Sequence, residues 1–115
     1  MKDCIFCKIV RGEIPSKKAY EDETTLAFFD IAPQAETHVL VIPKRHLDHL
    51  DAAEAELDDA AFAHLFRVAT RVARELGLPG GGYRLVSNCG AHACQTVPHL
   101  HLHILGGNQL TGRMG

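Results

Sequence analysis

Three histidines occupy every second position of a short apolar run near the C-terminus, in the stretch TVPHLHLHIL over residues 96–105. Successive side chains of a strand point to opposite faces, so His99, His101 and His103 are predicted to share one face while the aliphatic residues between them enter the core. Such a row of imidazoles has three interpretations: a solvated row without chemistry, a metal site, or a catalytic group with its partners.

The spacing argues against one metal ion bound by all three histidines. His99 and His103 lie roughly 13 Å apart along a strand, whereas a zinc to nitrogen bond is about 2 Å long. An imidazole nucleophile at the middle position, His101, fits the spacing better, with flanking groups that bind an anionic substrate. Gln95 and Thr96, just upstream, supply amide and hydroxyl donors suited to a phosphate.

The four cysteines raise a separate question about metals. Cys4 and Cys7 have the C-x2-C spacing of half a tetrahedral zinc site, which needs two further ligands, and the pair alone is ambiguous. A redox dithiol would normally open a helix after a strand, and no strand precedes this pair. Cys89 and Cys94 could pair or bind a second metal with His92, but two reduced thiols near a loop are the simpler expectation.

Length and charge limit the class of protein. A chain of 115 residues with 46% hydrophobic residues suits one domain with a real core. The net charge of −2, with scattered basic residues, predicts no binding to long nucleic acid. The N-terminus carries charges within its first residues and resembles neither a signal peptide nor a membrane span, so we expect a cytoplasmic protein with no membrane partner.

The elements that must position the histidines are read from hydrophobic periodicity. Strands are predicted at 18–20 and 25–29 around a turn at 21–23, and a buried strand in HVLVIPKRH is predicted to end near Pro43. Two more strands are predicted in GGGYRLVSNC and HLHLHIL. One long helix is predicted over 58–76. This order predicts an α+β domain with a mainly antiparallel sheet.

The helix prediction rests on a stripe and two end signals. Asp58 is placed to cap the first turn, and Gly77 with Pro79 should end the helix. The residues of the predicted buried stripe are Ala61, Leu65, Ala69, Val72 and Leu76.

The run from His99 to Leu105 resembles the histidine triad signature of alternating histidines and apolar residues. The chain is similar to the Hint-like branch of that superfamily through IFCKIVRGEIP, LAFFDIAPQAETHVLVIPKRH, GYRLVSN and QTVPHLHLHILGG, which together run from Cys4 to Leu110. The resemblance implies a single domain of the histidine triad (HIT) fold over 1–115, with an N-terminal segment 1–10 and a tail 108–115. It also implies a homodimer whose sheets join across the two-fold axis.

The resemblance implies a phosphoramidase that converts purine nucleoside 5′-phosphoramidates or aminoacyl adenylates to the nucleoside monophosphate. His101 would attack the α-phosphorus, and water would then cleave the nucleotidyl-histidine intermediate. A dinucleoside polyphosphate hydrolase of the same superfamily is one alternative. A non-catalytic nucleotide-binding or interaction module is another, and a metal-dependent hydrolase using the histidine row is a third.

The remaining site residues also follow from the resemblance. His103 and Asn88 would contact phosphate, with Gln95 nearby, and Thr96 would neutralise charge on the phosphoryl oxygens. Asp30 would bind the ribose hydroxyls, while adenine and guanine are not distinguished. The purine would lie in an apolar slot formed by Ile5, Phe6, Ile9, Phe29 and Ile31.

Many bacterial members of the superfamily bind structural zinc through residues that match Cys4, Cys7, His46 and His99. The resemblance therefore implies a structural Zn2+ and neither a catalytic metal nor an organic cofactor. His99, the first catalytic triad position, would then serve as a zinc ligand, and the chemistry would fall to His101 and His103.

Two features depart from the family pattern. Cys94 stands where members usually carry glycine, and a positive φ at this position would cost conformational energy and could misplace the phosphate-binding amides. The tail GGNQLTGRMG lacks the tryptophan of the closest relatives, so leaving-group preference is not transferred.

Overall fold

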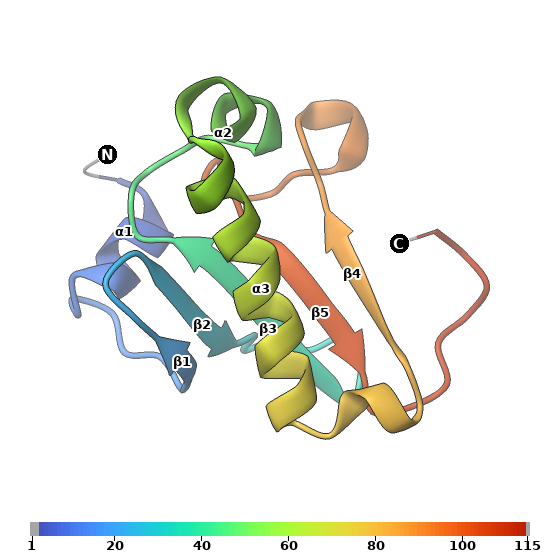
Figure 1. Ribbon diagram of the computed structural model, residues 1–115. Helices are drawn as coiled ribbons and strands as arrows, with labels where there is room; N and C mark the ends of the chain where they lie inside the picture. The colour runs from blue at the N-terminus through green and yellow to red at the C-terminus, as the bar shows by residue number, and fades with distance from the viewer. Residues whose placement is uncertain (1–2, 115) are drawn as a thin grey trace.

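The computed structural model describes residues 3–114, and its centre is a five-stranded antiparallel sheet with the strand order β1-β2-β3-β5-β4 (Figure 1). The strands are β1 Lys18–Glu21, β2 Thr25–Phe29, β3 Thr37–Pro43, β4 Tyr83–Ser87 and β5 Leu102–Gly106. The helices are α1 Ile5–Val10, α2 Leu50–Glu56 and α3 Asp59–Glu75, with 3-10 turns at Leu78–Gly80 and Ala91–Ala93. The α+β class is confirmed. The first two residues of the predicted N-terminal segment and the last of the tail lie outside the described residues.

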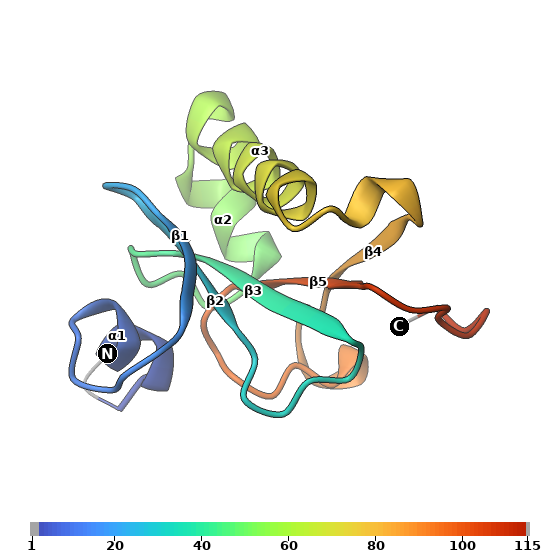
Figure 2. The same cartoon turned by 90° about the horizontal axis from the view of Figure 1, so that it is seen from below.

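Alternating side chains divide the core between the two faces of the sheet. Ala27, Val39 and Val41 face α3, whereas their neighbours Leu40 and Ile42 face α1. Figure 2 shows α2 and α3 above the sheet and α1 below it. The central strand β3 is therefore covered on both sides, which explains why it reads as a continuous apolar run.

Helix α3 begins and ends at the predicted signals. Asp58 Oδ1 accepts a hydrogen bond from Ala61 N–H at 2.8 Å, and Gly77 adopts φ +75° just after the helix. The predicted stripe was too long at both ends, since Ala61 and Leu76 are exposed. The buried residues are Leu65, Val68, Ala69, Val72 and Ala73.

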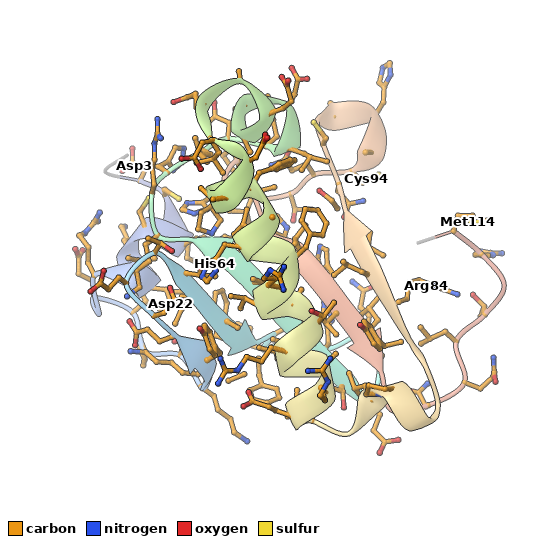
Figure 3. The ribbon with its side chains drawn as sticks, in the orientation of Figure 1. Asp3, Asp22, His64, Arg84, Cys94 and Met114 are labelled. Atoms are coloured by element: carbon orange, nitrogen blue, oxygen red, sulfur yellow. The ribbon has the colours of Figure 1, made fainter. Side chains whose placement is uncertain are left out.

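A polar contact fixes α3 to the first hairpin. Asp22, in the turn after β1, accepts from His64 Nε2 at 2.7 Å and from Tyr20 Oη at 2.8 Å, and Figure 3 shows the first pair side by side. Burial opposes ionisation of Asp22, but these bonds and the N–H groups of Thr24 and Thr25 together lower the pKa of its carboxyl below the ordinary value.

The sequence did not predict α1 and α2. Both are too short to show periodicity, and both have unusual caps. Cys4 Sγ accepts from Cys7 N–H at 3.3 Å at the start of α1, and His49 Nδ1 accepts from Ala52 N–H at 3.1 Å at the start of α2. Across residues 3–114, none of the helices is long and apolar enough to cross a membrane.

The strand expected over the histidine row begins later than predicted. The first paired residue of β5 is Leu102, opposite Val41 and Ser87, so only His103 of the three histidines lies in the ladder. Upstream, Leu100 N–H donates to Leu47 O at 2.7 Å instead of to a neighbouring strand. The chain therefore joins the sheet only after His101, and the backbone of residues 99–101 is free for contacts outside the sheet.

Candidate active site and metal centre

The histidine row keeps the side-chain arrangement that alternation predicts. Phe6 of α1 packs edge-on against the rings of both His99 and His101, at centroid distances of 5.8 and 5.2 Å, and His103 lies 4.9 Å beyond His101. His99 and His101 are buried, and His103 is half-buried. The hydrogen bonds of the three rings nevertheless differ, and so does the chemistry open to each.

A backbone carbonyl fixes the proton of His101. Its Nδ1 lies 2.7 Å from His99 O, and because a carbonyl oxygen only accepts, Nδ1 carries the proton. In the neutral ring the lone pair is then on Nε2. This is the tautomer that a nucleophilic imidazole requires.

A relay fixes the proton of His103 in the opposite sense. Gln34 N–H donates to His38 Nδ1 at 3.0 Å, so the neutral His38 ring carries its proton on Nε2. That nitrogen lies 2.9 Å from His103 Nδ1, which must therefore accept. His103 is left with Nε2–H as a donor. The contact of His38 with His103 was not predicted from the sequence.

The histidines of this relay are neutral at physiological pH. Burial, together with the nearby imidazoles of His101 and His38, lowers the pKa of His103 from its ordinary value of 6.5 to about 4, against the attraction of Asp30. Burial also lowers the pKa of His38, against the attraction of Asp30. His103 thus offers a hydrogen-bond donor without a full positive charge.

We expect the free energy of unfolding to fall as the pH drops from 6.5 toward 4. The lowered pKa of folded His103 keeps it neutral there, while the unfolded chain takes up a proton. This contribution is complete above pH 6.5 and is lost toward about pH 4, by up to about 1.4 kcal/mol per pH unit. Urea unfolding at pH 7 and pH 5 should show a smaller loss for His103→Gln than for the wild type. Equal losses would assign the effect to other groups.

Several of the residues predicted to be catalytic line a pocket of about 290 Å³. Its wall includes His101, His103, Asn88 and Thr96, as predicted, and also His38. Asn88 Nδ2 donates to Ala93 O at 2.8 Å, which holds the loop that follows β4. The pocket therefore presents hydroxyl, amide and imidazole groups around one space, an arrangement suited to an anion.

Gln95 and Asp30 are engaged with the backbone. Gln95 Nε2 donates to Asp48 O at 2.6 Å and to Val97 O at 3.0 Å, and its Oε1 accepts from Gly90 N–H. Its amide therefore shapes the loop, and its contact with nucleotide stays a prediction. Asp30 Oδ1 accepts from Ala32 N–H, and its Oδ2 lies 3.5 Å from His38 Nε2.

The five residues predicted to form the base slot are not gathered into one cluster. Phe6 and Ile9 are buried in the core below the sheet, whereas Phe29 packs against the core on the other face. Strand alternation puts Phe29 there, opposite to its neighbour Phe28. Ile5 and Ile31 are exposed, Ile31 completely so. Their contact with a base stays a prediction.

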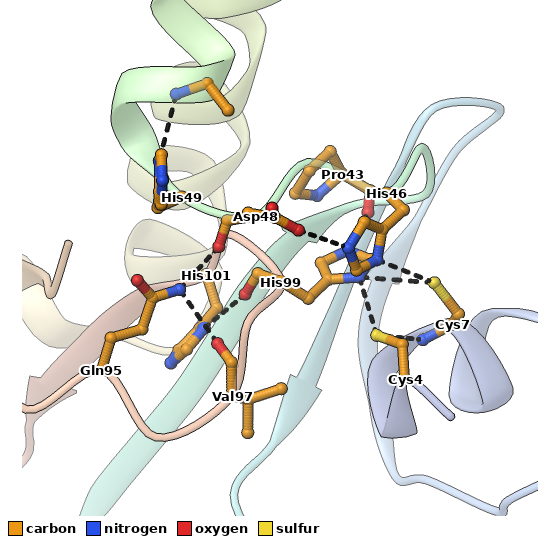
Figure 4. Close-up of polar contacts among 11 residues, drawn as sticks. Cys4, Cys7, Pro43, His46, Asp48, His49, Gln95, Val97, His99 and His101 are labelled. Carbon is orange, nitrogen blue, oxygen red and sulfur yellow. Dashed lines mark hydrogen bonds and ion pairs between the residues drawn. The ribbon is translucent and has the colours of Figure 1, made fainter. Parts of the chain in front are cut away.

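The cysteine pair and two histidines do converge. The ligand atoms of Cys4, Cys7, His46 and His99 all lie within 4.8 Å of one another. Cys4 Sγ is 3.3 Å from His99 Nδ1, and Cys7 Sγ is 3.3 Å from His46 Nδ1 (Figure 4). Two sulfurs and two nitrogens in this arrangement are a donor set typical of structural zinc.

The surroundings of these ligands fit a metal as well. His99 Nε2 lies 2.8 Å from Pro43 O, and His46 Nε2 lies 2.8 Å from Asp48 Oδ1. Both contacts place the proton on Nε2 and leave the Nδ1 lone pair directed toward the thiols, which is the support that zinc-binding histidines receive. Burial raises the pKa of Cys7, so a cation is needed to hold the thiolate form.

A second group, Asp30, His38 and His103, also has its ligand atoms within 4.8 Å of one another. Here His38 Nε2 and His103 Nδ1 hydrogen bond to each other, so a metal would have to break the relay to reach them. The cysteine and histidine group is therefore the better candidate for a metal centre.

Cys94, which stands where family members usually carry glycine, adopts the left-handed backbone conformation. Its φ is +60°, the one positive φ among the described residues other than glycine. The residue is exposed and lies in the loop after β4 (Figure 3). It also lines the pocket of His101 and His103. Cys89 and Cys94 are both free thiols, and with His92 they form no metal cluster within residues 3–114.

We expect Cys94→Gly to leave stability unchanged or to raise it by up to about 1 kcal/mol. Relief of left-handed strain, about 1–2 kcal/mol, is partly offset by the greater freedom of glycine in the unfolded chain. Urea unfolding measures the effect, with Cys94→Val as the opposite case, because a branched side chain tolerates this conformation less well. A glycine variant less stable by more than about 1 kcal/mol would mean that the thiol makes compensating contacts.

A larger hollow, about 680 Å³, is lined by none of the histidines among the described residues. It is formed by the turn around Gly81, the start of β4 and the C-terminal tail, where Arg84 Nη2 donates to Thr111 O at 2.6 Å. Among residues 3–114, the titratable groups that line it are Tyr83 and Arg84, so this larger volume does not mark the predicted site.

Together the fold and the histidine row define a histidine triad protein. The HIT domain family matches residues 11–110, and the chain belongs to this family. It is 41% identical over 109 residues to the purine nucleoside phosphoramidase of Escherichia coli, covering 95% of this chain and 91% of that protein. It is 51% identical over 106 residues to an uncharacterised 13.2 kDa HIT-like protein of Azospirillum brasilense, covering 92% and 87% of the two chains.

Solved structures agree with the fold. A HIT family hydrolase from Legionella pneumophila matches with a TM-score of 0.92 and 44% identity, covering 98% of this chain and 100% of that one. A histidine triad protein from Clostridium difficile matches with a TM-score of 0.88 at 44% identity, covering 99% and 98%. The histidine triad resemblance seen in the sequence is confirmed.

Proposed function

We propose that the protein is a nucleotide phosphoramidase that acts through a covalent nucleotidyl-histidine. The observation that carries this proposal is the His101 tautomer, which places a lone pair on Nε2 of a residue in the wall of an anion-suited pocket. The 41% identity to a purine nucleoside phosphoramidase supports the same activity.

The proposed reaction has two displacements at phosphorus. His101 Nε2 forms a bond to the α-phosphorus as the bond to the leaving amine, or to the carboxylate of an aminoacyl adenylate, breaks. Water then attacks the same phosphorus, releases the imidazole and gives the nucleoside monophosphate. Histidine suits both steps because imidazole is neutral enough to attack near pH 7 and forms a labile phosphorus to nitrogen bond.

The neighbouring groups would stabilise the charge that develops on the phosphoryl oxygens. His103 offers its Nε2–H, Thr96 a hydroxyl and Asn88 an amide on the same wall. His38 would keep His103 in its donor form through the relay. Asp30 would accept from the ribose hydroxyls.

A turnover assay tests the proposal directly. Purified protein should release AMP from adenosine 5′-phosphoramidate, and faster than it cleaves diadenosine tetraphosphate. The opposite order would favour the alternative, a dinucleoside polyphosphate hydrolase. Saturable AMP binding without release from either substrate would reject catalysis and leave a nucleotide-binding module.

A structural Zn2+ at Cys4, Cys7, His46 and His99 forms part of the proposal. The metal would neutralise the two thiolates and tie α1 to the sheet, and its binding energy would stabilise the fold. We assign it no part in the chemical steps. Equal turnover by zinc-loaded and metal-free protein that is still folded would support that separation.

We also propose a homodimer of single-domain chains in which the outer edge of β4 pairs with a second copy. All five residues of β4 are only half-buried, and this strand pairs on one side with β5 alone within the described chain. Sedimentation equilibrium would test the dimer. Four unpaired cysteines accord with the cytoplasmic location that cell fractionation would test.

A further inference from the structure

One residue, Asp48, contacts both the metal centre and the loop beside the catalytic pocket. Its side-chain Oδ1 lies 2.8 Å from Nε2 of the metal ligand His46. Its main-chain oxygen accepts from Gln95 Nε2 at 2.6 Å. Figure 4 shows the resulting chain of contacts from Cys7 through His46 and Asp48 to Gln95.

The contact of the Asp48 carboxylate controls the tautomer and the orientation of the His46 ring. A carboxylate that accepts from Nε2–H fixes the tautomer with its proton on Nε2 and makes the Nδ1 lone pair a stronger metal ligand. His99 receives the same support from a backbone carbonyl, Pro43 O, which no side-chain substitution removes. Asp48 is therefore the one partner of the two ligand histidines whose contribution can be deleted without altering a ligand.

The main-chain contact extends to the phosphate-binding side. Gln95 bonds to Asp48 O, to Val97 O and to Gly90 N–H, and it directly precedes Thr96. The two sites also share a wall, because a hollow of about 480 Å³ is lined by both Asp48 and Thr96. Thr96 lines the catalytic pocket as well. A displacement of Asp48 would therefore alter both the metal centre and the catalytic pocket.

We propose that Asp48 is a positioning residue that couples the metal centre to the loop between β4 and the histidine row, residues 88–98. Its carboxylate contacts the metal ligand His46, and its main-chain carbonyl contacts Gln95 of the loop. The inference rests on the proposed zinc centre and extends it. It assigns the loop a role in metal retention, although no residue of the loop binds the metal.

Zinc affinity of the full-length protein, measured by competition with a chromophoric chelator, tests this without any assay of activity. Asp48→Ala should weaken zinc binding about tenfold, the lower end of what a supporting carboxylate contributes, because its side chain is 62% exposed. Asp48→Asn keeps an acceptor oxygen and should recover part of the loss. The matched control Asp51→Ala removes an exposed carboxylate three residues away and should leave the zinc affinity unchanged.

A second variant tests the hydrogen bond between Gln95 and the main chain of Asp48. Gln95→Met keeps the length of the side chain but removes its donors, and it should weaken zinc binding by a smaller factor in the same direction. Unchanged zinc affinity in Gln95→Met would overturn the coupling to the loop. Equal affinities for Asp48→Ala and Asp51→Ala, with zinc bound by the wild type, would overturn the role of Asp48. A wild type that binds no zinc would instead reject the metal centre and this inference with it.

Discussion

Replacement of His101 by alanine is expected to reduce AMP release from adenosine 5′-phosphoramidate by about four orders of magnitude or more, the scale seen when a covalent nucleophile is removed. The ring supplies the Nε2 lone pair that forms the intermediate, and no other group in the described pocket is held in the same way. His103 cannot substitute because its Nδ1 accepts from His38 and its Nε2 carries the proton.

The controls for this variant separate chemistry from folding. His101 is buried against Phe6, so its removal leaves a small cavity, and retained AMP binding with cooperative unfolding must show that the site survives. His64→Ala removes a histidine that is bonded to Asp22 and does not line the pocket, and this variant should keep the turnover of the wild type. Residual activity in His101→Ala within tenfold of the wild type would reject covalent catalysis at this residue.

The parts of the site that were predictable lie close together in sequence. Alternation alone placed His101 and His103 on one face, and the C-x2-C spacing indicated half of a metal site. Asp58 and Gly77 set the ends of the long helix, because a cap depends on neighbours within one turn. Local rules therefore recovered the shared face of these histidines, the ends of the long helix and the fold class.

The missed residues depend on strand register and loop packing. His103 pairs opposite Leu40 of β3, which places His38 two residues away on the same face. Nothing in the sequence fixes that register before the strands pair. The hydrogen bond from Gln95 Nε2 to Asp48 O was likewise not predictable, because it depends on the close approach of two segments that are far apart in the sequence. Long-range contacts decide such cases.

Removal of one metal ligand is expected to have the largest effect on stability. In the presence of zinc, Cys7→Ser should unfold at a temperature more than about 10 °C below that of the wild type. Zinc at a thousandfold excess over Kd adds about 4 kcal/mol to the folded state, and each kcal/mol moves the Tm of a domain of this size by about 4–8 °C. Calorimetry or circular dichroism with and without added zinc provides the measurement.

The comparison in chelator identifies the metal as the cause. Without zinc, the wild type should lose most of its advantage, and the two proteins should differ only by the cost of a smaller polar side chain in the core below the sheet. Cys89→Ser, which alters an exposed thiol outside the cluster, should behave as the wild type in both conditions. If chelation leaves the Tm of the wild type unchanged, the four side chains form a hydrogen-bonded core cluster rather than a zinc centre. His99 and His46 would then be bonded to neutral thiols, and α1 would be held to the sheet by these hydrogen bonds and by the packing of Phe6 and Ile9.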